Sequence, residues 1–167
     1  MEREKKILNK QISDNEILNK MFRYCSYQER SVYDVRKQLD RYHVNDMLAS
    51  HIIARLIDEG FLNEKRFAET YTTGKLRSNS WGKIKIMQGL KERLIDSQII
   101  NEAIESIDES EYQRIIEKLI DKKLKLIRDT DPYIIKNKVA RFVISKGFES
   151  HLVWEEVNNQ LDKLNSV

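Results

Sequence analysis

The stretch Val35-Arg36-Lys37-Gln38-Leu39-Asp40-Arg41-Tyr42-His43-Val44 places apolar residues at i, i+4 and i+9. The same spacing returns twice, at Ile86, Leu90 and Ile95 and at Val139, Val143 and Phe148. The first members of the triplets lie 51 residues (35 to 86) and 53 residues (86 to 139) apart. A period of about fifty residues indicates a repeat architecture, in which each unit buries its apolar face partly against its neighbours.

Each copy of the pattern carries three segments with the i, i+3/i+4 spacing of amphipathic helices, and no segment shows sustained strand-type alternation. The sequence therefore predicts an all-α fold of three tandem three-helix repeats, with short connections that favour antiparallel neighbours. We expect an N-terminal extension over residues 1–14 and repeats over residues 15–62, 63–110 and 111–164.

Residues that begin and end helices support these divisions. Ser31 with Asp34 resembles a capping box, and Asn63 is a second N-cap candidate. Asp131 followed by Pro132 predicts a helix start, because proline suits the first helical position. Gly60 is expected to end its helix in the left-handed conformation.

The second repeat contains the weakest helix signals. Thr-Thr-Gly followed by Ser-Asn-Ser predicts a loop in the latter part of residues 72–80. Ser80 is expected to cap the next helix, whose apolar stripe would include Ile84 and Leu94. Residues 108–110 read as a linker to the third repeat, and Glu155 and Glu156 read as part of a solvent-facing stripe.

Composition favours a helix-rich cytoplasmic protein. Charged residues make up 34% of the chain, which has 5 Gly and 1 Pro. No window approaches 18 uninterrupted apolar residues, and the first six residues lack the apolar segment of a secretory signal. Cys25 is the only cysteine, so an internal disulfide is impossible, and its place on an apolar stripe predicts a buried, unreactive thiol.

The charges are banded along the chain. Residues 61–95 hold 8 Lys/Arg against 3 Asp/Glu, and residues 122–148 hold 8 against 2. Residues 96–121 hold 2 against 8, and residues 149–167 hold 1 against 4. Clustered positive charge suits polyanions or acidic protein surfaces, although segregated solvent-exposed helix faces would give the same pattern.

The sequence gives little support for catalysis, a metal or a cofactor. His43, His51 and His151 are scattered, and no paired His or Cys motif has the spacing of metal ligands. The glycines do not form a phosphate-binding loop, and no carboxylate pair is placed for acid–base chemistry. We therefore predict a binding protein rather than an enzyme, without cofactor or metal.

The strongest functional candidate is the basic segment from Lys75 to Arg93, which contains Trp81. A basic helix that starts beside an aromatic residue could contact phosphates or stack on bases, while Trp81 could equally anchor its loop on the core. The candidate cations of this segment are Lys75, Arg77, Lys83, Lys85, Lys91 and Arg93.

Several stretches resemble the RecX family of bacterial regulators of the RecA recombinase. Residues 56–68, which include Gly60-Phe61-Leu62-Asn63-Glu64-Lys65-Arg66-Phe67-Ala68, are similar to its most specific segment. Arg30-Ser31 with Asp34-Val35 and Gln38-Leu39, Ser80-Trp81-Gly82 with Lys85-Ile86 and Leu90, and Lys146-Gly147-Phe148 resemble three further motifs. The matched stretches follow the family's order over roughly residues 18–164.

The chain departs from the family pattern at two turns. Where the family often has a glycine before the third helix of the first and second repeats, this chain has Tyr42-His43-Val44 and Arg93-Leu94-Ile95. These turns must close without the residue that most easily adopts a left-handed conformation. Asp34 and Gln38 also replace a typical Glu and Lys.

The resemblance implies a cytoplasmic modulator, usually an inhibitor, that lies in the groove of the RecA–DNA filament. It also implies an elongated, bent array of three helix-turn-helix-like repeats, and roles in recombination, DNA repair and the SOS response. We expect a monomer that binds RecA, with contact to single- or double-stranded DNA possible and no membrane association. Arg36, Lys37 and Arg41 join the second-repeat cations as expected contact residues. The alternative is a helix-turn-helix-type protein that binds nucleic acid without RecA.

Overall fold

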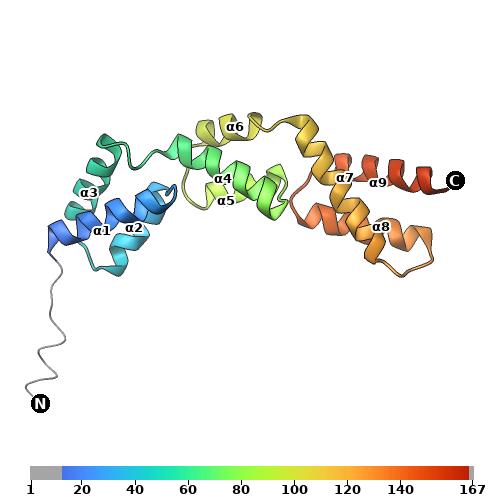
Figure 1. Ribbon diagram of the computed structural model, residues 1–167, viewed down its shortest axis with the longest axis horizontal. Helices are drawn as coiled ribbons and strands as arrows, with labels where there is room; N and C mark the ends of the chain where they lie inside the picture. The colour runs from blue at the N-terminus through green and yellow to red at the C-terminus, as the bar shows by residue number, and fades with distance from the viewer. Residues whose placement is uncertain (1–12, 166–167) are drawn as a thin grey trace, which may run out of the picture. The chain divides into compact units, whose positions relative to one another are not determined.

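The computed structural model describes residues 13–165, and every regular element in this range is an α-helix (Figure 1). In chain order the helices are α1 (Asp14–Tyr27), α2 (Val32–Arg41), α3 (Asp46–Asp58), α4 (Glu64–Asn79), α5 (Lys83–Lys91), α6 (Ser97–Glu105), α7 (Glu109–Leu126), α8 (Pro132–Ser145) and α9 (Ser150–Asn165). The predicted all-α fold with three sets of three helices is confirmed. Most of the predicted N-terminal extension, residues 1–12, lies outside the described residues.

The helices group into two compact units that meet between Phe67 and Ala68 in the sequence. The first unit contains α1 to α3, and the second contains α5 to α9 with most of α4. The second and third sets of helices thus share one unit. This division does not test the predicted repeat boundaries, which stay predictions. Within the described residues, no helix combines the length and apolar character needed to cross a membrane.

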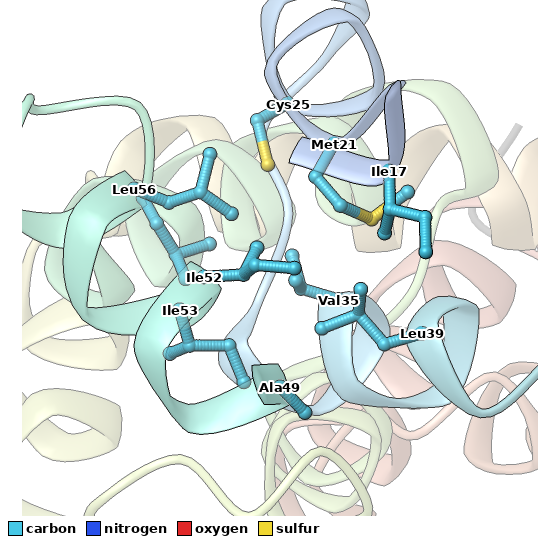
Figure 2. Close-up of a cluster of buried hydrophobic side chains, with 10 residues drawn as sticks. Ile17, Met21, Cys25, Val35, Leu39, Ala49, Ile52, Ile53 and Leu56 are labelled. Carbon is cyan, nitrogen blue, oxygen red and sulfur yellow. The ribbon is translucent and has the colours of Figure 1, made fainter. Parts of the chain in front are cut away.

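The core of the first unit lies where α1, α2 and α3 meet (Figure 2). Its labelled side chains are Ile17, Met21, Cys25, Val35, Leu39, Ala49, Ile52, Ile53 and Leu56. The first two members of the first triplet belong to this core, as the spacing predicts. Cys25 is buried here as expected, and burial raises the pKa of its thiol to about 11. A raised pKa keeps the thiol protonated at neutral pH, which suppresses its reactivity.

The core of the second unit contains the other two triplets completely. Ile86, Leu90 and Ile95 are buried, as are Val139, Val143 and Phe148. They are joined by the inward face of α7, where Tyr112, Ile116 and Ile120 are buried. The i, i+4, i+9 spacing therefore marks core positions in both units.

The family-like segment at residues 60–68 shapes the connection between α3 and α4. Gly60 has φ +77° and ends α3, and the Asn63 side chain accepts a hydrogen bond from the Arg66 amide at 2.9 Å. The Arg66 guanidinium donates to the Gly60 carbonyl at 3.0 Å and forms an ion pair with Glu29. This arginine thus ties the turn back to the end of α1, which accounts for an Arg at this position.

The turn before the third helix of each set contains one left-handed residue. These residues are His43 (φ 54°), Leu94 (φ 57°) and Gly147 (φ 92°). At the first turn the Val44 amide donates to the Leu39 carbonyl, and at the second the Ile95 amide donates to the Leu90 carbonyl, each at 3.3 Å. The two turns without glycine therefore keep the same geometry, with residues that disfavour it.

The prediction of a loop in the latter part of residues 72–80 is wrong, because α4 continues to Asn79. Ala68, Thr72 and Leu76 are buried at i, i+4 and i+8, so the helix places a continuous stripe in the core. Thr72 is 2% exposed and packs as a small apolar residue would. Gly74 lies on the exposed side, where an added Cβ would meet nothing within 4 Å.

Three further expectations about side chains are corrected. Ser80 does not cap α5: it has φ 51°, and the N-cap is Gly82. Ile84 and Leu94 are not core residues, because they are 54% and 77% exposed. Glu156 does not face solvent: it is 8% exposed and accepts hydrogen bonds from Gln113 and Gln160.

Candidate functional site

Trp81, in the connection between α4 and α5, lies between two lysines. The ammonium groups of Lys75 on α4 and Lys85 on α5 are each 4.7 Å from the centroid of its ring. The Trp81 amide also donates to the Lys75 carbonyl at 3.1 Å, which holds the loop against the end of α4. Cation–π contacts of this kind contribute about 0.5–1 kcal/mol each at exposed sites. Trp81 therefore orients two cations as well as anchoring its loop.

The same arrangement continues along α4 to Tyr71. The Lys75 ammonium lies 5.4 Å and the Arg93 guanidinium 5.1 Å from the centroid of the Tyr71 ring. Arg93 also donates to the Gly89 carbonyl at 3.0 Å. A Cβ at Gly89 would lie 2.2 Å from the Tyr71 hydroxyl oxygen, so only glycine leaves room for this ring.

Five side chains thus alternate cation, ring, cation, ring and cation, and they come from α4, the α4–α5 loop, α5 and the turn that follows α5. We call this set the basic–aromatic row, and its members are Lys85, Trp81, Lys75, Tyr71 and Arg93. Three of the six cations predicted in this segment belong to it. Tyr71 was not among the candidate residues predicted from the sequence. The available signal was its i, i+4 spacing to Lys75 on one helix.

Arg77 and Lys83, two other predicted contact residues, form ion pairs within the second unit. Arg77 contacts both carboxylate oxygens of Glu111, at 2.7 and 3.0 Å, and Lys83 pairs with Glu109. The Arg77 guanidinium holds the pKa of Glu111 below its ordinary value. The prediction that residues 108–110 form a linker is wrong. Asp108 caps α7, and Glu109 and Glu111 lie in the first turn of that helix.

The remaining predicted cations are exposed. Lys91 lies in the last turn of α5, in the second unit. Arg36, Lys37 and Arg41 lie on α2, in the first unit. The Lys37 ammonium is 5.8 Å from the Tyr33 ring, and Arg41 donates to the Gln38 side chain at 3.2 Å.

The N-terminus of α5, beside the row, is capped by residues of α7 and of the α8–α9 turn. The Gly82 amide donates to the Lys146 carbonyl at 2.9 Å, and the Ile84 amide donates to the Gly147 carbonyl at 3.1 Å. Between them, the Lys83 amide donates to the Tyr112 hydroxyl at 2.9 Å. Three amides at the start of a helix, which have no intrahelical acceptor, are thereby satisfied.

Tyr112 holds this junction together. Its hydroxyl donates to Glu149 at 2.6 Å, and its ring centroid lies 5.1 Å from that of Phe148. Burial, followed by the hydrogen bond to Glu149, raises the pKa of Tyr112, so the hydroxyl stays protonated. The Lys83 ammonium lies 4.6 Å from the Tyr112 ring. One side chain thus links α5, α7 and the start of α9.

Two glycines allow the backbones to meet at this junction. A Cβ at Gly82 would lie 2.2 Å from the Gly147 carbonyl oxygen. A Cβ at Gly147 would lie 2.3 Å from the Lys85 Cβ. Since Lys85 belongs to the basic–aromatic row, the close approach of Gly82 and Gly147 also fixes one end of that row.

The chain matches two family models that describe the same helices. Residues 63–104 match the second three-helix domain of RecX, and residues 109–156 match the third. The chain belongs to the RecX family. The family expected from the quoted motifs is therefore confirmed.

Curated relatives carry the name regulatory protein RecX. The chain is 33% identical to the protein from Clostridium tetani over 81% of its own length and 60% of that protein's. It is 27% identical to the protein from Lactobacillus gasseri over 93% of its own length and 59% of that protein's. The chain thus spans about three-fifths of the length of these two RecX relatives.

Two solved structures share the fold. A crystal structure of regulatory protein RecX superposes with a TM-score of 0.78 at 21% identity, covering 87% of this chain and 71% of that one. RecX from Lactobacillus salivarius gives a TM-score of 0.75 at 22% identity, covering 92% and 97%. At these identities the likeness concerns the helical arrangement alone.

Two RecX-like motifs that lie far apart in the sequence meet at the junction. Ser80 is the left-handed residue that follows α4, Trp81 is one of the two rings of the row, and Gly82 is the N-cap of α5. Residues 146–148 provide two capping carbonyls and the ring beside Tyr112. The glycines of both RecX-like motifs therefore have a common physical reason, which is backbone contact.

Proposed function

We propose that this chain is a RecX-type regulator that binds the RecA nucleoprotein filament and restrains its growth, ATP hydrolysis and strand exchange. It would thereby modulate homologous recombination and DNA repair. Family membership and the relatives' shared name, regulatory protein RecX, support this role. As part of the proposal the protein acts in the cytoplasm as a monomer without catalytic activity of its own.

The basic–aromatic row is the observation that supports a charged partner most directly. Its cations lie against rings, so less side-chain freedom is lost on binding than for an unsupported lysine. Complementary charge accelerates association and selects partners. Lys75 and Lys85 of the row would face acidic side chains of the recombinase. Arg77 and Lys83, which have carboxylate partners within the chain, would contribute less.

The test is a reaction with RecA, single-stranded DNA and ATP, followed by the rate of ATP hydrolysis and by strand exchange. The unaltered protein should slow both. Lys75→Glu combined with Lys85→Glu should lose most of this inhibition, because the reversed charges repel an acidic partner. Circular dichroism should show unchanged helicity in the variant.

A matched control is Lys118→Glu with Lys163→Glu, which makes the same charge change at exposed positions away from the row. These changes should leave inhibition intact. Unaltered protein with no effect at several-fold molar excess contradicts the proposed function. Inhibition that survives in the row variant contradicts only the role of the row.

A further inference from the structure

The second basic band of the chain is carried by the end of α7, the α7–α8 loop and α8. Both carboxylates in residues 122–148 are used to build the loop. Asp131 accepts hydrogen bonds from the Tyr133 and Ile134 amides at the start of α8. Asp129 accepts from the Thr130 and Asp131 amides and from the Lys138 ammonium. These carboxylates therefore do not balance the other cations of the band.

Two of the eight cations in this band have carboxylate partners, Lys125 with Asp121 at 2.7 Å and Lys138 with Asp129 at 2.9 Å. The other six form no ion pair with any residue in the described range 13–165. They are Lys122, Lys123, Arg128, Lys136, Arg141 and Lys146. The ammonium groups of Lys123 and Lys146 lie 4.9 and 5.8 Å from the Phe142 ring, which joins α7 to the end of α8.

An exposed aromatic side chain lies on α8, the helix that also carries Lys136 and Arg141. Tyr133, in the first turn of α8, is 75% exposed. Tyr133, Asn137 and Arg141 are spaced i, i+4 and i+8, so they share one side of α8. Asn137 donates to the Tyr133 carbonyl at 2.9 Å. A ring exposed on a helix that carries an arginine two turns further along can accept a stacked base while the arginine contacts a phosphate further along the strand.

We propose that the α7–α8 hairpin, residues 109–145 with Lys146, binds single-stranded nucleic acid. Its cations would neutralise phosphates and Tyr133 would stack on a base. The site lies in the third set of helices and shares no residue with the basic–aromatic row. It would bind nucleic acid whether or not the chain also binds a recombinase.

The residue types favour nucleic acid over an acidic protein or a membrane. Four of the six unpaired cations are lysines, which are depleted in the cores of protein–protein interfaces but common in contacts to phosphate. A membrane-surface helix needs a broad apolar face. Beside Tyr133, the large exposed apolar side chains of the hairpin are Leu126 at 68% and Ile134 at 39%.

The probe is a fluorescein-labelled oligothymidine, whose anisotropy is followed as the full chain is added at a series of salt concentrations. Binding should weaken steeply with salt, with a log–log slope of about −0.7 per phosphate neutralised. Lys122→Ala with Arg141→Ala should reduce the slope by about 1.4. Tyr133→Ala should weaken binding roughly 5- to 100-fold, whereas Tyr133→Phe should keep it.

The matched control is Arg36→Ala with Lys37→Ala, which removes the same charge from the first unit and should leave the slope unchanged. An equal loss in both double variants means that only net charge matters and overturns the proposal. The proposal is also overturned if polyglutamate displaces the labelled oligonucleotide as effectively as unlabelled oligothymidine does. Binding to phosphatidylserine-containing vesicles with no binding to the oligonucleotide overturns it as well. The assay contains no RecA, so its outcome is separate from that of the proposed function.

Discussion

At the scale of single residues, two turns use side chains where glycine would be easier. Leu94 has φ 57° and is 77% exposed, and His43 has φ 54°. The left-handed conformation costs roughly 1–2 kcal/mol for a residue with a Cβ. The backbone hydrogen bonds of both turns form nonetheless, from Val44 to Leu39 and from Ile95 to Leu90. The sequence shows that both turns lack glycine, but it does not show that His43 and Leu94 adopt the left-handed conformation instead.

Leu94→Gly should stabilise the protein by about 0.5–1 kcal/mol, because relief of the strained φ exceeds the added freedom of the unfolded chain. Urea unfolding followed by tryptophan fluorescence measures the change. Lys91→Gly, in the last turn of α5, is the control: it has no positive φ to relieve and should destabilise by roughly 1 kcal/mol. Destabilisation by Leu94→Gly would contradict the strain argument.

At the scale of helices, the hydrogen-bond acceptors at the start of α5 could not be predicted from the sequence. N-caps such as Ser31, Asn63 and Asp131 were predictable, because the capping group lies within a few residues of the helix. Gly82 makes no side-chain cap hydrogen bond, and the acceptors for α5 come from Tyr112 and the α8–α9 turn. No local pattern carries that information, so Ser80 was the natural but wrong choice.

The end of α4 was missed for a related reason. Thr-Thr-Gly is a poor helix former by propensity, but burial of Thr72 and Leu76 decides the outcome. The basic–aromatic row depends on this extra length, because Lys75 lies in the part predicted as weak. Its cations could be nominated from composition, whereas their order along the rings required the structure.

Gly82→Ala should destabilise the second unit by roughly 1–3 kcal/mol, since an added Cβ would overlap the Gly147 backbone and the helices must separate. Thermal unfolding by circular dichroism measures the loss. Gly74→Ala is the matched control. Its Cβ would have no atom within 4 Å, and alanine is more favourable than glycine inside a helix, so the protein should become more stable by roughly 0.5–1 kcal/mol. Equal effects of the two substitutions would show that the glycine contact is unimportant.

At the scale of the whole molecule, each unit has a core of its own. Leu39 is fully buried in the first and Leu90 in the second. The repeated spacing predicted both cores, but the joining of the second and third sets of helices depends on Tyr112, Gly82 and Gly147, which the spacing does not include. Both tryptophans of the chain, Trp81 and Trp154, lie in the second unit.

Leu39→Ala should therefore lower the stability seen by circular dichroism, by roughly 2–5 kcal/mol for the first unit, and leave the tryptophan transition in place. Leu90→Ala should shift the tryptophan transition instead. Urea titrations with both signals on the same samples make the comparison. If Leu39→Ala moves both transitions equally, the chain unfolds as a single cooperative unit.

The approach of Gly82 to Gly147 limits how this chain can evolve. Most crowded contacts can be repaired by shortening a neighbouring side chain, but a Cβ at Gly82 would strike backbone atoms of residues 147 and 148. No second substitution at Gly147 can make room, because it has no side chain to lose. A lineage that alters either glycine therefore has no compensating mutation at the other, whereas the exposed lysines can be exchanged one at a time. The residues that contact a partner can therefore change during evolution while Gly82 and Gly147 stay the same.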